Sequence, residues 1–205
     1  MFYDKINLER IFREEIMIII KDKKDSIAKI EQMGLNHFPQ EVFETGDKVA
    51  IKEFFDKNPA DEYVLRSTTK AKGQFFYVKD FEHAQEFIDK FEDEVTVAVS
   101  MNYYKDCIVL LGDIVVKRDG SSEYVDITAR DDEEANHRNI YTQPKYNMHA
   151  SLEDDKLWRI PGFSKLMRYI SEHELYNVIL EFVVYDCKVG VNKENVVIIE
   201  ARTGY

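Results

Sequence analysis

The sequence predicts an α+β fold in which helices pack on a largely antiparallel sheet. The order of the expected elements supports this prediction: helices come first, followed by a strand–loop–strand unit, a helix, further strands, another helix and a closing hairpin. The spacing of apolar residues also changes after Pro59, from the three- and four-residue spacing of helices to the runs typical of strands. We find no internal repeat that would suggest another architecture.

Length and composition are those of a single domain. The 205 residues are 44% apolar, enough for a substantial core, and we expect a helical subdomain over residues 1–60 and a sheet-rich part over residues 61–205. The net charge of −11 argues against binding to nucleic acid or to an anionic membrane, because both need a positive surface. Cys107 and Cys187 have no CxxC spacing, and no cleavage or spanning signal is present, so we expect a reduced, cytoplasmic protein.

The first part of the chain should contain three helices. For the second of them, Asp25 or Ser26 is a suitable N-cap, and Gly34 is the residue type favoured in the left-handed C′ position. The expected elements are a helix over residues 6–24, this shorter helix, a loop over residues 36–39 and a helix over residues 47–56.

Strands dominate the rest of the chain. We expect strands over residues 62–67 and 74–79, a helix over 80–91, a meander of strands over 95–100, 107–117 and 123–129, a helix over 161–174, and a hairpin of strands over 178–185 and 196–201. Residues 130–156 are polar and aperiodic, and loops this long are usually functional or disordered. We expect this segment either to close over the site as a lid or to remain a disordered surface loop.

The closing hairpin carries the clearest chemical signal. Each strand has one carboxylate among apolar residues, Glu181 and Glu200, and an unpaired carboxylate is costly to bury. Because side chains alternate between the faces of a strand, Glu200 and Arg202 should share a face about 7 Å apart. If Glu181 and Glu200 share a metal ion, they must face one another across the hairpin. A tight turn over residues 192–195 would instead pair Glu200 with Cys187.

The loop after the first expected strand is a candidate anion site. Backbone N–H groups in a turn of small residues, together with positive side chains, can hold a polyphosphate. The alternative is a solvated, lysine-rich hairpin, because the loop has one glycine and no Walker pattern. The residues with suitable groups are Arg66, Ser67, Thr68, Lys70, Lys72 and Gly73.

Three short stretches together resemble a known superfamily. They are VLRSTT at residues 64–69, the carboxylates Glu181 and Glu200 with the EAR sequence at 200–202, and the KIEQMGLNHFP sequence at 29–39. They are similar to the Val-Arg-Ser-Ser strand end, the late acidic residues with a following arginine, and the Gly-Leu-x-x-Pro turn of the ATP-grasp superfamily. The resemblance is nearest to the nucleotide-binding domain of pyruvate phosphate dikinase and phosphoenolpyruvate synthase.

This resemblance implies an ATP-grasp-like domain that binds ATP with Mg²⁺ and transfers a phosphoryl group or activates a carboxylate as an acyl phosphate. Its partners would be the nucleotide and an acceptor that the sequence does not identify. The implied roles are nucleotide binding by Arg66, Ser67, Thr68, Lys70 and Gly73, metal binding by Glu181 and Glu200, and catalysis by Arg202 and Lys72.

A competing interpretation is a non-enzymatic interaction protein that retains a degenerate ATP-grasp fold. In its favour, Gly73 is the one glycine of a loop that has several in the superfamily, and Arg66 replaces a lysine that often precedes that loop. Glu200 and Arg202 could also simply pair with neighbours at the edge of a sheet. Zinc and serine hydrolase chemistry find no support, because the sequence has no HExxH, no Cys/His ligand spacing and no GxSxG.

Overall fold

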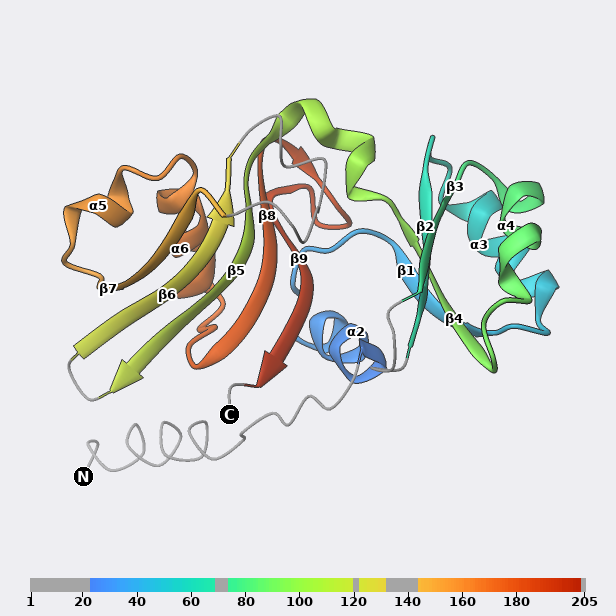
Figure 1. Cartoon of the computed structure of the whole chain (residues 1–205), viewed down its shortest axis with the longest axis horizontal. Coiled ribbons are helices and arrows are strands. Elements are labelled where there is room, and N and C mark those ends of the chain that lie inside the picture. Colours follow the sequence, from blue (N-terminus) through green and yellow to red (C-terminus); the bar gives the residue numbers. More distant parts are fainter. Residues whose placement is uncertain (1–22, 69–73, 120–121, 132–143, 204–205) are drawn as a thin grey trace, which may run out of the picture.

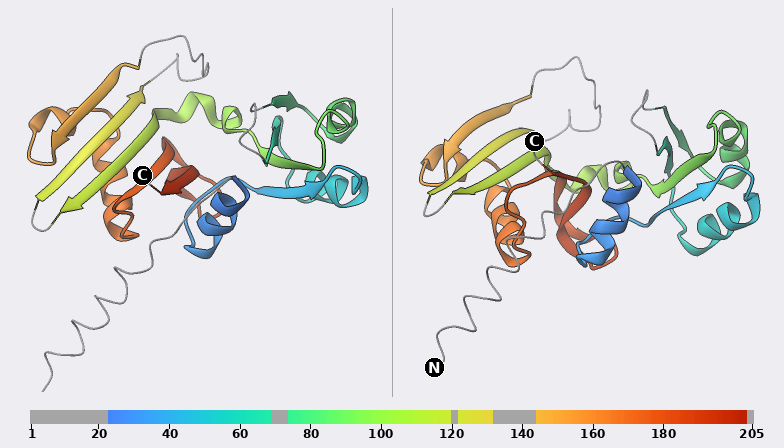
Figure 2. Two further views of the ribbon diagram at one scale, coloured as in Figure 1. Left: turned by 60° about the horizontal axis from the view of Figure 1, so that its bottom comes forward. Right: turned by 90° about the horizontal axis from the view of Figure 1, so that it is seen from below.

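The computed structural model describes residues 23–68, 74–119, 122–131 and 144–203 of the chain. Within these ranges the strands form two sheets, and every pair of neighbouring strands is antiparallel. The two sheets stand side by side, with helices on the outer side of each (Figures 1 and 2). The α+β class and the antiparallel pairing predicted from the sequence are therefore confirmed.

The smaller sheet has four strands, and two helices cover its outer face (Figure 1). Side chains alternate along its strands, so that Leu65 and Val97 are buried against Ile51 and Ile88 of these helices. Its strands, in spatial order, are β1 (Gln40–Glu44), β4 (Glu94–Val99), β2 (Tyr63–Ser67) and β3 (Phe75–Val78), and its helices are α3 (Lys48–Lys57) and α4 (Phe81–Ile88).

The larger sheet has five strands and its own core. Ile114 and Ile127 from its outer face pack with Phe163 and Ile170 of the last helix. Its strands, in spatial order, are β7 (Tyr146–Ser151), β6 (Ser122–Arg130), β5 (Ile108–Asp119), β8 (Val178–Val189) and β9 (Glu194–Thr203). The remaining helices are α2 (Lys23–Gln32), α5 (Asp155–Trp158), α6 (Phe163–Glu172) and the 3₁₀ helix η1 (Met101–Cys107).

Local sequence signals explain where several helices begin and end. Asp47 caps α3 by accepting from the Ala50 N–H at 3.0 Å, and Asp80 caps α4 by accepting from the His83 N–H at 2.8 Å. Gly34 has a φ of 65° directly after α2, as expected for a C′ glycine. The proposed N-caps Asp25 and Ser26 are wrong, however, because both residues lie inside α2.

The expected meander is also wrong. β4 belongs to the smaller sheet and β5 to the larger one, because η1 carries the chain from one sheet to the other between them (Figure 1). Of the three strands in the expected meander, only β5 and β6 pair with each other, with Ile114 opposite Ile127. The consequence is functional, since two separate sheets can border a cleft and a single meander cannot.

Two strands fall where the sequence did not predict strands. β1 lies between the expected loop and α3, and pairs with β4. β7, followed by α5, lies inside the segment expected to be an aperiodic loop, and pairs with β6. Residues 132–143 of that segment, where the expected lid would have its centre, lie outside the described residues, as do most of the helix expected over residues 6–24 and the loop residues 69–73. The division of the chain at residue 60 stays a prediction.

β5 and β6 approach each other so closely at Gly112 that there is no room for a side chain. A Cβ atom at this position would lie 2.2 Å from the backbone oxygen of Thr128. We expect Gly112→Ala to lower the free energy of unfolding by about 1 to 3 kcal/mol or more, because backbone atoms in a paired strand cannot move aside. Gly46→Ala is the matched control, since a Cβ there meets nothing within 4 Å. Equal denaturant midpoints for the two variants would contradict this prediction.

Candidate functional site

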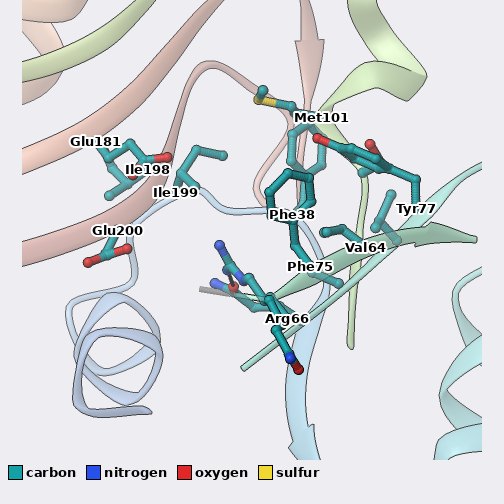
Figure 3. Close-up of a pocket in the computed structure, with 15 residues that line it drawn as sticks. Phe38, Val64, Arg66, Phe75, Tyr77, Met101, Glu181, Ile198, Ile199 and Glu200 are labelled. Atoms are coloured by element: carbon teal, nitrogen blue, oxygen red, sulfur yellow. Dashed lines mark hydrogen bonds between the residues drawn. The ribbon is translucent and has the colours of Figure 1, made fainter. Parts of the chain in front are cut away.

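A cleft of about 290 Å³ lies between the two sheets. All four strands of the smaller sheet contribute to its lining, and β8 and β9 line it from the larger sheet (Figure 3). Phe75 and Tyr77 of the edge strand β3 form an aromatic wall, with ring centroids 5.7 Å apart. The cleft therefore combines a largely apolar part with a small number of charged groups, as ligand sites commonly do.

Arg66 is the cation of the cleft lining. Its Nη2 donates to Oε1 of Gln40 at 2.7 Å, whereas its Nε is buried and has no hydrogen-bond partner among the described residues. Burial lowers the pKa of Arg66, and the carboxylate of Glu200 on the other sheet acts in the opposite direction. The guanidinium nevertheless stays charged at neutral pH. A desolvated guanidinium with an unused donor is well suited to bind an anion.

Glu181 and Glu200 lie on the opposite wall of the cleft. They are direct cross-strand partners on β8 and β9, so their side chains share a face. Glu181 is only 7% exposed, and both residues line the cleft on the side facing Arg66 (Figure 3). The condition for a shared metal ion, that the two carboxylates face one another across the hairpin, is therefore met.

A β-bulge in β9 produces this arrangement. Phe182 pairs with Ile198 and Glu181 pairs with Glu200, so that Ile199 is the extra residue on β9. In a regular ladder Glu200 would lie opposite Leu180, on the face that is packed in the core. Because a slip of one residue turns a side chain to the other face, the bulge is what directs Glu200 into the cleft.

The turn of the hairpin differs from the prediction. Val189 pairs with Glu194, so the turn lies over residues 190–193, two residues earlier than expected. Continued regularly from this turn, the ladder would place Glu200 opposite Val183, and not opposite Cys187. The irregularities between Val184 and Val189 and between Glu181 and Phe182 then shift the partner of Glu200 to Glu181.

Arg202 contacts carboxylates in this structure. Its Nη2 lies 3.0 Å from Oδ1 of Asp113, and its Nε lies 3.3 Å from Oε1 of Glu200. Asp113 on β5 is also the direct cross-strand partner of Glu181. Sequence reasoning missed Asp113 because its proximity to the acidic pair depends on the pairing of β5 with β8, which no local signal indicates.

The other predicted nucleotide-binding residues divide into two groups. Ser67 and Thr68 line a second hollow beside Lys90 and are not part of the cleft lining that contains Arg66, although Gln74 borders both hollows. The remaining predicted residues, Lys70, Lys72 and Gly73, lie outside the described residues. Sequence reasoning also missed Gln40, because it lies on β1, a strand that was not predicted.

The acidic pair has the donor chemistry of a magnesium site. Carboxylate oxygens suit this hard cation, and an ion shared by Glu181 and Glu200 would offset the repulsion between directly opposite like charges. In the part of the chain that the structure describes, no group of three or more His, Cys, Asp or Glu side chains is arranged to hold a metal ion. Further ligands would then come from bound phosphates and water, as is usual for magnesium.

Comparison with solved structures identifies the fold. An N5-carboxyaminoimidazole synthase from Aspergillus clavatus, solved with ADP and 5-aminoimidazole ribonucleotide, matches 97% of this chain and 50% of its own with a TM-score of 0.54 and 13% identity. D-alanyl-alanine synthetase A from Vibrio cholerae matches 88% of this chain and 54% of its own, with a TM-score of 0.51 and 11% identity. These proteins are ATP-grasp ligases, and this chain has their fold.

The chain spans about half the length of these structures. Their likeness to this chain is one of fold, and it does not support the dikinase nucleotide-binding domain as the nearest relative. The sequence matches no family model, and a comparison with curated proteins found no match. Every helix within the described ranges is too short or too polar to span a bilayer.

Proposed function

Because the chain has the fold of ATP-dependent ligases, we propose that its cleft binds ATP with Mg²⁺ and uses it to activate a carboxylate for ligation. One observation carries the proposal: the cleft places the guanidinium of Arg66 on one sheet opposite Glu181 and Glu200 on the other. A triphosphate held together with a magnesium ion needs this combination of a positive group and oxygen ligands.

Each part of the cleft has a role in this proposal. The apolar surface around Phe38, Tyr77 and Met101 is suited to the planar nucleobase, since aromatic side chains stack on such rings. The guanidinium of Arg66 donates to a phosphate oxygen. Glu181 and Glu200 would hold the magnesium ion, which would neutralise phosphate charge during transfer.

The loop residues complete the proposed nucleotide site. Lys70, Lys72 and Gly73 are expected to cover the phosphates, as are Ser67 and Thr68, and these roles stay predictions. The catalytic contact of Arg202 with a phosphate or the acceptor also stays a prediction, because its guanidinium is bound to Asp113 and Glu200 here.

The reaction that this arrangement would support has two steps. A carboxylate oxygen of the first substrate forms a bond to the γ-phosphorus of ATP, and ADP leaves, which gives an acyl phosphate. A nitrogen nucleophile then attacks the acyl carbon and expels inorganic phosphate, while its proton passes to solvent. The protein contributes mainly by positioning the reactants and by neutralising charge.

Nucleotide binding is the direct test. We expect Mg-ATP at millimolar concentration to raise the melting temperature, because a ligand bound only by the folded state stabilises it. ATP with EDTA should give a smaller shift, and Glu200→Gln should reduce the shift with Mg-ATP. The absence of both a thermal shift and calorimetric heat with Mg-ATP or Mg-GTP would contradict the proposal and favour the interaction protein.

A further inference from the structure

The acidic pair of the cleft is part of a longer row of carboxylates. Asp113 on β5 pairs with Glu181 on β8, which in turn pairs with Glu200 on β9. Direct cross-strand partners share a face, so the three carboxylates lie side by side across three adjacent strands. Like charges in this arrangement repel each other, and the row therefore needs positive charge close by.

Arg202 supplies positive charge at one end of this row. Its guanidinium joins the two outer carboxylates, with 3.0 Å from Nη2 to Asp113 and 3.3 Å from Nε to Glu200. In the backbone ladder Arg202 itself lies opposite Ile179, an uncharged residue. The residue directly opposite Arg202 on β8 thus offers it no carboxylate. The arginine side chain instead reaches across β8 to Asp113.

Exposure divides the row into an outer and an inner end. The side chains of Arg202 and Asp113 are 46% and 48% exposed, whereas the side chain of Glu200 is 17% exposed. Glu181 is buried at 7% exposure and lines the cleft with Glu200. The guanidinium thus occupies the solvent side of the row, and the inner side of Glu181 and Glu200 remains directed at the cleft.

The charges of the row allow one divalent ion. Three carboxylates and one guanidinium have a formal charge of −2, which one Mg²⁺ balances. A guanidinium cannot lose its proton at ordinary pH, so it cannot make way by deprotonation. Metal–oxygen contacts near 2.1 Å also require the carboxylates to close around the ion, and the guanidinium already contacts both Asp113 and Glu200.

We propose that Arg202 is a built-in cation that takes the place of a metal ion at the outer end of the carboxylate row. The cleft then holds a single divalent ion, at Glu181 and Glu200, and the nucleotide must complete its coordination. Arg202 is a positioning residue in this role, because it acts through Asp113 and Glu200. This inference rests on the proposed function, which assigns a metal ion to Glu181 and Glu200. Its test uses no nucleotide, so it does not depend on ATP binding.

The test measures Mn²⁺ affinity in the absence of nucleotide, from the electron paramagnetic resonance signal of the free ion. Arg202→Met keeps the length of the side chain and removes its charge, and we expect it to bind one Mn²⁺ at least about tenfold more tightly than the unmodified protein. Arg202→Gln should behave in the same way. Arg202→Lys should stay within about threefold of the unmodified protein, because it retains the charge. Adding Asp113→Asn to Arg202→Met should remove the gain.

Arg118→Met is the matched control. Arg118 is on the other face of β5, is ion-paired with Glu123 and has a side chain that is 45% exposed, so its loss changes the net charge equally. Equal Mn²⁺ affinity in the Arg202→Met, Arg202→Gln and unmodified proteins would overturn the inference, and so would an equal gain in Arg118→Met. Failure of ATP binding would leave this measurement unchanged, so the two proposals can fail separately.

Discussion

Replacing Asn36 by alanine is expected to lower the free energy of unfolding by about 3 to 5 kcal/mol. Asn36 is completely buried between α2 and the closing hairpin. Its Nδ2 donates to the carbonyl oxygens of Val189 at 3.0 Å and Val196 at 2.8 Å, and its Oδ1 accepts from the N–H of Asn192 at 2.9 Å. Alanine leaves these three backbone groups without their partner, and each such loss costs about 1 to 3 kcal/mol.

The backbone of Asn36 makes this prediction specific to its side chain. Its N–H donates to the hydroxyl of Tyr169 at 2.7 Å, and its carbonyl accepts from the N–H of Ile198 at 2.8 Å. Both bonds can persist in the alanine variant. Asn192→Ala is the control, since the Nδ2 of Asn192 makes an exposed bond to Gly34 and its loss should cost about 1 kcal/mol or less. Similar unfolding free energies from urea denaturation of the two variants would refute the role of Asn36.

Replacing Arg66 by methionine is expected to weaken Mg-ATP binding by about 2 to 3 kcal/mol, roughly 30- to 150-fold in Kd, because a hydrogen bond from a charged donor is lost. The same change should leave the melting temperature of the nucleotide-free protein unchanged or raise it. A buried charge is costly, as the lowered pKa of Arg66 indicates, and an apolar side chain of similar size is often tolerated at such sites.

These opposite effects separate a ligand-binding role from a structural one. Isothermal calorimetry gives the Kd, and a thermal melt without nucleotide gives the stability. Arg118→Met removes the same charge at a surface ion pair and should bind Mg-ATP like the unmodified protein. A variant of Arg66 that loses stability but binds Mg-ATP normally would show that Arg66 supports the fold and not the nucleotide.

Elements with a strong local signal could be predicted from the sequence. α3 and α4 begin directly after Asp47 and Asp80, whose side chains cap them, and their apolar spacing is clear. The β2–β3 and β8–β9 hairpins were predicted from their β-rich runs. The sequence also showed that Glu181 and Glu200 must lie face to face to share a metal ion, but it left open the register that pairs Glu200 with Cys187.

Elements that depend on distant partners could not be predicted. β1 and β7 have the sequences QEVFE and YNMHAS, which are polar and short, and they become strands because β4 and β6 offer them free edges. The separation into two sheets depends on η1, whose sequence MNYYKDC carries no strong helical signal. The contributions of Gln40 and Asp113 to the site follow from these pairings, so they were missed for the same reason.

The bulge at Ile199 means that the number of residues in β9 specifies the site as much as their types do. A regular ladder that kept Ile199 would carry Glu200 and Arg202 to the helix-covered face and bring Ala201 to the cleft, although every charged residue would still be present in the sequence. Related chains should therefore be aligned here by strand pairing, with a single-residue gap permitted between the positions of Ile198 and Glu200. An alignment without that gap would misplace the counterpart of Glu200 by one position in a chain that lacks the extra residue, although a regular ladder would still bring its acidic pair together.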